Sequence, residues 1–205
     1  MLCECLSSLQ QRRTGIIAAG TVMYRDKTLI PTEAIRLAAL GTLALQPMSY
    51  ADLAREVRAF TSRIAGPSLD MMGTSIELLR TESLVAPLEG SGAGAAAGPE
   101  TLLALTPQGQ AELHELMTSN VRSPLDGVSK LVFALKLRFL HLLPADDAHA
   151  QRDLMIEIST SERARLIDLK ARHAGEAGHF AGWLDGEIDA LDHRIAWLAA
   201  IGRTA

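Results

Sequence analysis

The sequence predicts a mainly α-helical protein, in which an N-terminal unit of four helices and two strands precedes an all-helical C-terminal unit. Two observations predict this fold class. The 205 residues are 48% hydrophobic but only 4% aromatic, and Ala and Leu, which favour helices over strands, supply most of the apolar content. Apolar residues also recur at intervals of three and four along most of the chain, which is the period of one helix face.

Charge and cysteine content narrow the classes of function. The chain has 20 basic and 24 acidic residues, a formal net charge of −4, so its composition alone indicates no nucleic-acid partner. Two cysteines cannot build a disulfide framework, and we therefore expect a reducing, cytoplasmic location. The apolar run over residues 16–23 is far shorter than the about 20 residues that cross a bilayer, so no membrane partner is expected.

Residues 1–31 are the first segment, and they show no sustained hydrophobic period. We expect an N-terminal extension here, which is either flexible or the result of a misassigned start, because Met23 offers an alternative initiation site. Since the helical pattern begins only after Pro31, removal of the residues before Met23 is expected to leave the fold intact.

Start and stop signals delimit the first two helices. Pro31, followed by Thr32 and Glu33, opens a helix that ends before Pro47. Ser49 is the expected N-cap of a second helix, SYADLAREVRAF, whose acidic first turn suits the positive end of the helix dipole. Both helices carry an apolar face, so both are expected to pack into a core.

A third helix, two strands and a fourth helix complete the N-terminal unit. Apolar residues at helical spacing predict the third helix: Leu69, Met72, Ile76 and Leu79. Two short apolar runs, LVAPLE and TLLALT, flank a glycine-rich loop and indicate strands, and Thr106 with Pro107 opens the fourth helix. This order predicts a winged helix-turn-helix domain with a small two-stranded wing, at residues 32–122.

The C-terminal part, residues 123–205, is predicted to be all-helical. A long amphipathic helix ends before Pro144, and a mixed helical stretch follows over residues 148–174. The last helix carries apolar residues spaced by four, three, four and three, a heptad seam that is typical of a narrow contact between two helices. The seam consists of Leu184, Ile188, Leu191, Ile195 and Leu198.

Three segments resemble the PadR family of bacterial transcription regulators. They are SYADLAREV in the second helix, GTSIELLRTESLV in the third, and LLALTPQGQAEL in the second wing strand and fourth helix. The resemblance covers residues 32–201 and implies a homodimeric regulator, a repressor, that binds a pseudo-palindromic operator in double-stranded DNA. It also implies that the seam from Leu184 to Leu198 belongs to a dimerisation helix, which makes residues 123–205 the dimerisation domain.

In a helix-turn-helix domain the third helix enters the major groove with its N-terminal residues at the base edges. Arg is the usual reader of guanine, while Ser and Thr bond either to bases or to phosphates. Arg55 and Arg58 share a face of the second helix, where they could contact phosphates or pair with Asp52 and Glu56. Arg36 and Arg63 are further candidates for phosphate contacts. The expected DNA contacts are Arg55, Arg58, Met71, Gly73, Thr74, Ser75, Glu77 and Arg80.

The resemblance also implies a small aromatic effector, because members of the family often sense phenolic acids or hydrophobic drugs between the helical tail and the DNA-binding domain. The candidate residues for that pocket are Phe139, Trp183 and Trp197, with Arg138 and Arg172 as partners for a ligand carboxylate. The alternative interpretation places these aromatic side chains in the core and in a dimer interface.

No motif points to a cofactor, a metal or catalysis, so the protein is not expected to be an enzyme. Gly98 and Pro99 break the glycine-rich loop where a dinucleotide-binding motif would start a helix. No two histidines are three or four residues apart, and Cys3 with Cys5 is a weak ligand set. The alternative to a DNA-binding regulator is a helical adaptor whose winged helix binds protein, and the acidic balance and a wing without Arg or Lys favour it.

Overall fold

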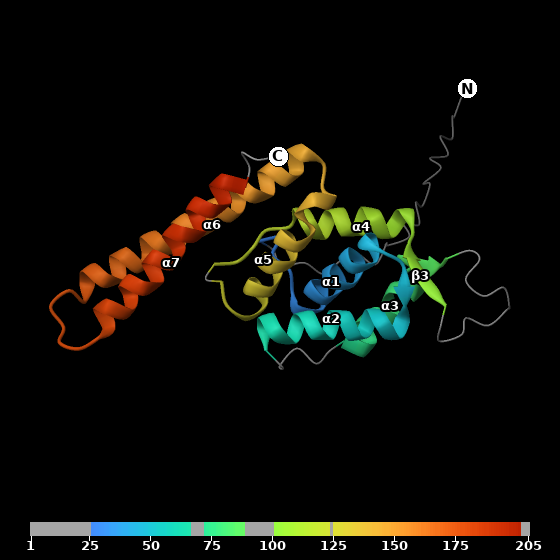
Figure 1. Ribbon diagram of the computed structural model, residues 1–205, viewed down its shortest axis with the longest axis horizontal. Helices are drawn as coiled ribbons and strands as arrows, with labels where there is room; N and C mark the ends of the chain where they lie inside the picture. The colour runs from blue at the N-terminus through green and yellow to red at the C-terminus, as the bar shows by residue number, and fades with distance from the viewer. Residues whose placement is uncertain (1–25, 67–71, 89–100, 124, 202–205) are drawn as a thin grey trace, which may run out of the picture.

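The computed structural model describes residues 26–66, 72–88, 101–123 and 125–201 (Figure 1). The mainly helical fold class and the predicted order of elements are confirmed. The elements are α1 (Pro31–Leu45), β1 (Met48–Ser49), α2 (Tyr50–Ala65), α3 (Met72–Thr81), β2 (Val85–Pro87), β3 (Leu102–Leu105), α4 (Pro107–Thr118), α5 (Gly127–Phe139), a 3-10 turn (Leu140–Leu142), α6 (Ala145–Arg172) and α7 (Phe180–Ile201).

The sheet has three antiparallel strands in the order β1-β3-β2, one more than the sequence predicted. Strand β3 is central: its Leu103 lies opposite Met48 of β1 on one side and Pro87 of β2 on the other. Two residues, the whole length of β1, are too few to show an alternating pattern, so the sequence carries no signal for this strand. The glycine-rich loop between β2 and β3 lies outside the described residues.

Side-chain caps fix where two helices begin. The hydroxyl oxygen of Ser49 accepts a hydrogen bond from the backbone N–H of Asp52 at 3.2 Å, which confirms the predicted N-cap of α2. Thr106 caps α4 in the same way, through the N–H of Gly109 at 3.0 Å, and Pro107 occupies the first helical position. These caps orient the helices that precede and follow the sheet.

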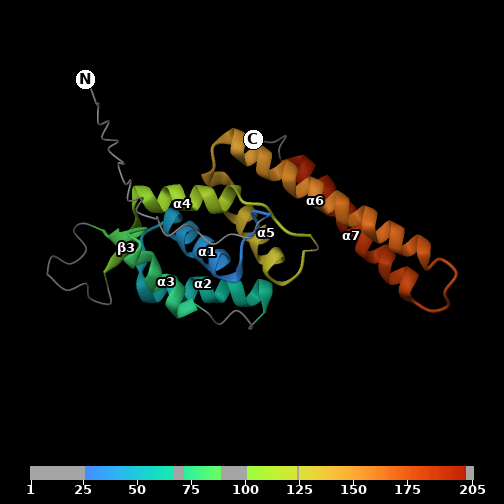
Figure 2. The same ribbon diagram turned by 180° about the vertical axis from the view of Figure 1, so that it is seen from behind.

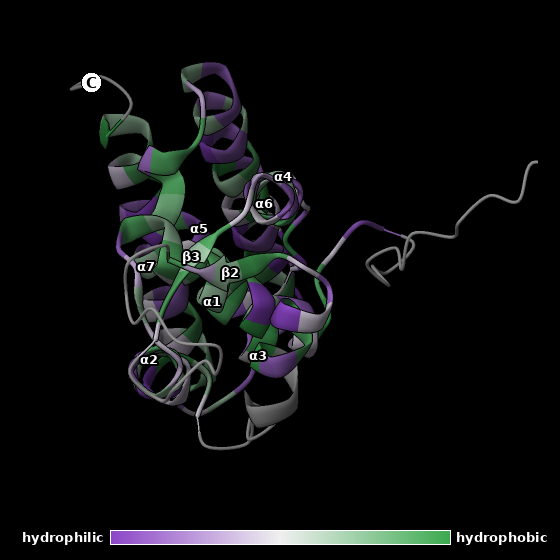
Figure 3. Cartoon of the chain, turned by 90° about the vertical axis from the view of Figure 1, so that its right-hand side faces the viewer, coloured by the Kyte–Doolittle hydropathy of each residue, from purple (hydrophilic) through white to green (hydrophobic). Residues whose placement is uncertain are grey.

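Helix α1 is at the centre of the core, where it contacts α2, α3, α4, α5 and β3. Figure 3 shows hydrophobic residues of α1 and the strands gathered in the middle of the molecule. Helix α5 approaches α1 so closely that a Cβ atom at Gly41 would lie 2.3 Å from the ring of Phe139, a separation that real side chains do not reach. Gly41 therefore permits this crossing, and α5 shares one core with the helices of the winged-helix unit.

Helices α6 and α7 form an antiparallel hairpin that extends away from this body (Figures 1 and 2). The contact predicted by the heptad spacing is present between the two helices of one chain. Leu184, Leu191 and Leu198 are 0%, 7% and 0% exposed, and Ile188 and Ile195 are half-buried. The three leucines are thus buried within the hairpin of one chain, and the dimerisation role expected for the seam stays a prediction.

The last residues of the predicted extension pack against the body. Thr28 forms a parallel bridge with Asn120, whose N–H donates to the carbonyl of Lys27 at 2.8 Å, and Leu29 is 5% exposed. The side-chain amide of Asn120 also donates to the carbonyl of Asp26 at 2.7 Å. Residues 26–29 therefore join the end of α4 before α1 begins, while residues 1–25 lie outside the described part of the chain.

Candidate nucleic-acid interface

Helix α3 is held by one face and presents the other to solvent. Ile76 and Leu79 are 1% and 0% exposed and belong to the core shared with α1. On the opposite side Glu77 and Arg80 are exposed, and so is Leu78, which is 49% exposed. The buried pair anchors the helix on the body, so Glu77, Leu78 and Arg80 face solvent.

The structure resolves the predicted base-contact residues to different degrees. Met71 lies outside the described residues. Gly73, Thr74 and Ser75 lie in the first turns of α3, where the structure defines the helical backbone. Glu77 and Arg80 follow on the exposed side of the same helix.

An open groove of about 500 Å³ separates α3 from the base of the wing. Its walls combine a guanidinium, a carboxylate and three hydroxyl groups with the apolar strand β2. The lining residues are Glu77, Arg80, Thr81, Ser83, Val85, Ala86, Pro87 and Thr106. Hydrogen-bond donors and acceptors next to an apolar wall are the chemistry that reads base edges and phosphates.

Arg36, a candidate for phosphate contact, is instead bound inside the protein. Its Nη2 lies 2.5 Å from Oε2 of Glu82 and its Nη1 lies 2.9 Å from Oε1 of Glu112, with 16% of the side chain exposed. Glu82 directly follows α3 and Glu112 belongs to α4. Arg36 therefore positions the end of α3, and no local sequence pattern indicates its two partners.

The arginines of α2 are exposed, and one of them is paired. Arg55 lies 2.8 Å from Asp52, and both side chains are more than half exposed, which is the pairing alternative left open above. Such an exposed pair contributes little to stability, so phosphate can replace the carboxylate at small cost. Within the described residues Arg58, Arg63 and Arg80 form no ion pair.

The three predicted effector residues do not come together. Phe139 is 0% exposed and packs on Gly41 in the core. Trp183 and Trp197 are 56% and 50% exposed on α7. Trp183 stacks on Phe180 at a centroid distance of 5.8 Å. Phe139 therefore has the core role of the alternative interpretation. Trp183 lines a pocket between α6 and α7, and Trp197 lies on the surface.

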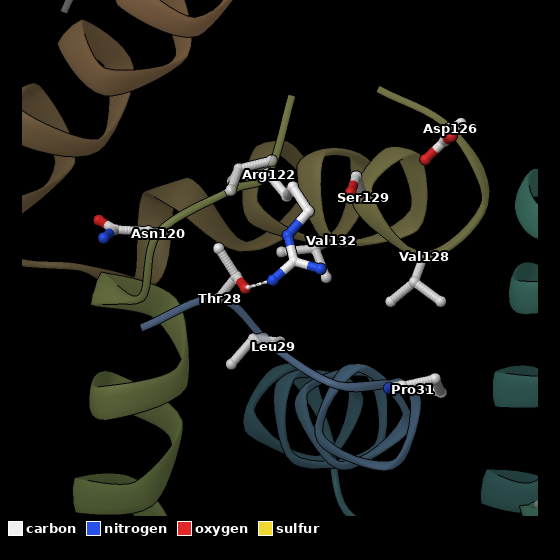
Figure 4. A pocket seen from close by; sticks show the side chains of 10 residues that line it. Thr28, Leu29, Pro31, Asn120, Arg122, Asp126, Val128, Ser129 and Val132 are labelled. Atoms are coloured by element: carbon white, nitrogen blue, oxygen red, sulfur yellow. Dashed lines mark hydrogen bonds between the residues drawn. The ribbon is translucent and has the colours of Figure 1, made fainter. Parts of the chain in front are cut away.

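A pocket of about 240 Å³ lies where residues 28–31, the α4–α5 connection and α5 meet (Figure 4). Figure 4 shows the Arg122 side chain reaching across it, and Nη2 of Arg122 donates to the hydroxyl of Thr28 at 3.2 Å and to Asp26 at 2.9 Å. Hydrogen bonds from Thr28 and Arg122 lower the pKa of Asp26 to about 2. The apolar part of the lining is Leu29, Pro31, Val121, Val128 and Val132. Because the residues that line this pocket are far apart in the sequence, no local motif predicts it.

Other classes of site receive no support from the part of the chain that the structure describes. There, no three His, Cys, Asp or Glu side chains are grouped so that they could hold a metal ion. None of the described helices combines the length and the apolar composition that a bilayer crossing requires. Besides the groove beside α3 and the pocket at Arg122, the described chain has a pocket of about 220 Å³ at Ile158, Trp183 and Leu191, and one of about 340 Å³ at Asp52, Arg55 and Arg138.

Comparisons with known proteins identify a family. A family model described as "Putative AphA-like transcriptional regulator" matches residues 24–202. No curated protein matches the sequence. The chain is similar to Bacillus subtilis PadR in complex with operator DNA, at 15% identity, 82% coverage of this chain, 97% of that chain and a TM-score of 0.32. The same protein in complex with p-coumaric acid is 16% identical, with 85% of this chain and 96% of that chain covered and a TM-score of 0.32. A PadR-like regulator from Bacillus cereus is 16% identical, with 82% of this chain and 93% of that chain covered and a TM-score of 0.33. The predicted class, a transcriptional regulator, is confirmed by the family match.

Proposed function

Because the chain belongs to the AphA-like family of transcriptional regulators, we propose that it is a repressor that binds a pseudo-palindromic operator in double-stranded DNA as a homodimer. The observation that carries the proposal is the groove between α3 and β2, where Arg80, Thr81 and Ser83 line an open surface beside a rigidly held helix. In this proposal residues 32–122 bind DNA, and Arg55 and Arg58 of α2 contact phosphates.

The dimer interface in this proposal is the outer face of the α6–α7 hairpin. Trp183, Ala190 and Trp197 are spaced by seven residues, and all three are exposed on α7. They flank the buried leucines of the heptad seam, and Phe180 and Ile167 add further apolar surface, 40% and 41% exposed. Exposed aromatic side chains in a row mark an interaction surface, and a second copy of the same hairpin has the matching row. Two α3 helices would then reach successive major grooves, about 34 Å apart.

The pocket at Arg122 is the place we propose for a small aromatic effector. Apolar side chains form much of its lining, and a guanidinium offers two parallel donors to a carboxylate. A ligand carboxylate that binds the Arg122 guanidinium competes with Asp26, whose Oδ2 lies 2.9 Å from Nη2 of Arg122. Binding would therefore loosen the segment that joins the start of α1 to the end of α4.

The experiment that tests the function is selection of genomic DNA fragments by the purified full chain, followed by binding assays on the selected sequence. Arg80→Ala is expected to weaken specific binding by about 1–3 kcal/mol if Arg80 reads a guanine. Arg172→Ala is the matched control, because Arg172 is an exposed arginine at the far end of α6. Equal loss in both variants would contradict the role of α3.

One observation favours the adaptor as the second candidate. Leu78 on α3 and Leu88 after β2 are 49% and 40% exposed, so the outer face of the winged helix is partly apolar. Apolar side chains can contact thymine methyl groups, but they also suit a protein partner. If no fragment is retained above background at low salt, the adaptor is the better account of this face.

A further inference from the structure

Lys136 of α5 is completely buried, and its ammonium group has three hydrogen-bond acceptors. Nζ donates to the carbonyl of Met117 and to the carbonyl of Ser119, both at 2.5 Å, and to Oε1 of Gln151 at 2.7 Å. The amide nitrogen of Gln151 in turn donates to the carbonyl of Thr118 at 3.3 Å. Side chains from α5 and α6 thus occupy three consecutive carbonyls at the end of α4.

This arrangement solves a general problem of helix ends. The last carbonyls of a helix have no partner within it and carry the negative end of the helix dipole. An ammonium group there is favourable, and its three N–H groups match the three acceptors. No carboxylate is among its hydrogen-bond partners, so the charge is balanced by dipoles alone, and a buried charge of that kind depends on every one of its bonds.

Two of the three bonds hold α5 to the end of α4, and the third, to Gln151, joins the hairpin to the winged-helix body. Gln151 is 7% exposed and lies in the second turn of α6, where that helix leaves the body. Farther out, α6 packs mainly against α7. Two surface bonds lie nearby: His114 to Asp147 at 2.8 Å and Ser123 to Glu162 at 2.9 Å. Lys136 is therefore the buried polar link between α4, α5 and α6.

We propose that Lys136 positions the α6–α7 hairpin on the winged-helix unit, and that the proton it carries controls this position and, through it, operator affinity. A neutral amine has two N–H groups for three acceptors, so either its lone pair faces an oxygen atom or the Gln151 amide turns over and loses its bond to Thr118. Loss of the proton therefore breaks the link on one side. The statement about operator affinity rests on the proposed function, whereas the statement about hairpin position does not.

The titration range and the surroundings support this proposal. Burial lowers the pKa of Lys136 to about 7. The charged side chains on the elements around it are engaged with one another or lie on outer faces. They include His114, Glu112 and Glu115 of α4, Lys130 and Arg138 of α5, Asp146, Asp147, Arg152, Asp153, Glu157 and Glu162 of α6, and Glu33 and Arg36 of α1. Arg36 is paired with Glu82 and Glu112, and Glu33 is bonded to the N–H of Ile30. His114 contacts Asp147 of α6 at 2.8 Å, so the test separates its contribution from that of Lys136.

The first experiment measures hairpin position by the distance between spin labels at Gln108→Cys and Ala171→Cys, with Cys3 and Cys5 changed to Ser and the labelled chain diluted in unlabelled protein. Both label sites are exposed, one on α4 and one on α6. We expect a narrow distance distribution near pH 6 that broadens near pH 8.5. Lys136→Met broadens it at both pH values, whereas Lys130→Met, an exposed lysine of the same helix, and His114→Gln behave like the parent chain.

Gln151→Glu tests the role of the proton itself and remains informative if Lys136→Met fails to fold. A carboxylate beside Nζ favours the charged form, so the broadening should move to higher pH, at the loss of the longer bond to Thr118. In the parent chain, operator affinity should fall by a factor of about five or more between the two pH values, the lower limit usual for coupled sites.

Each outcome decides one part of the proposal. If the distance distribution changes neither with pH nor on the Gln151→Glu substitution, the proposal is wrong. If the label distance responds to pH but operator affinity stays constant, the link to DNA is wrong. The role of Lys136 in positioning the hairpin then still stands. If the chain binds no DNA at all, the proposed function fails, and the label distances still decide the role of Lys136.

Discussion

The guanidinium of Arg36 lies 2.5 Å from the carboxylate of Glu82 and joins α1 to the residue that follows α3. The second carboxylate on the same guanidinium, that of Glu112, belongs to α4. All three side chains are largely buried, with 16%, 28% and 15% exposed. Through Arg36, the end of α3, the helix proposed to read DNA, is therefore connected to both α1 and α4.

Replacing Arg36 by Met should destabilise the fold and weaken operator binding. The change leaves Glu82 and Glu112 without their shared cation, and loss of one partner of a buried pair costs 3–5 kcal/mol. Partial exposure reduces this, so we expect about 2 kcal/mol in a denaturant titration. Arg55→Ala, which removes the exposed pair with Asp52, is the control and should change stability by less than about 1 kcal/mol. Equal losses of stability in the two variants would show that Arg36 has no special position.

The sequence predicted the helices well and their partners poorly, for one physical reason. Helical period and capping are local, so Ser49, Thr106 and the apolar faces of α1 and α2 could be recognised directly. A heptad seam, in contrast, has the same spacing whether its partner is another chain or α6 of the same chain. The carboxylates that bind Arg36 and the carbonyls that bind Lys136 are set by long-range packing, which no local pattern encodes.

The hairpin predicts different outcomes for two substitutions on α7. Trp197→Glu places a charge in the proposed dimer interface, so it should yield a folded monomer with unchanged helix content. Leu191→Asp places a charge inside the hairpin of one chain, so it should lower the melting temperature as well. Analytical ultracentrifugation and circular dichroism measure the two properties separately. A Trp197→Glu variant that remains dimeric at low concentration would remove the tryptophan row from the interface.

The Arg122 pocket predicts a ligand preference that depends on charge. An aromatic carboxylate such as benzoate should bind more tightly than its methyl ester, because the ester cannot accept a charge-assisted bidentate bond. Arg122→Gln should remove this preference, and Arg165→Gln, on the exposed face of α6, should retain it. Titration calorimetry on the full chain gives both affinities. If carboxylate and ester bind equally in the parent chain, the guanidinium is committed to Asp26 and Thr28 and the pocket has another use.

Lys136 gives the folding stability a distinct dependence on pH. Its pKa is about 7 in the folded chain and near 10.5 when exposed, so between these values the unfolded state binds more protons. Stability should therefore rise with pH across that window, while below about pH 7 the cost of the buried charge is present in full. The gain is about 1.4 kcal/mol for each pH unit in which only the unfolded state is protonated. Denaturant titrations of Lys136→Met should lack this rise and those of Lys130→Met should retain it. A difference curve between the parent chain and Lys136→Met that is flat from about pH 6 to pH 9 would show that the ammonium keeps its proton throughout.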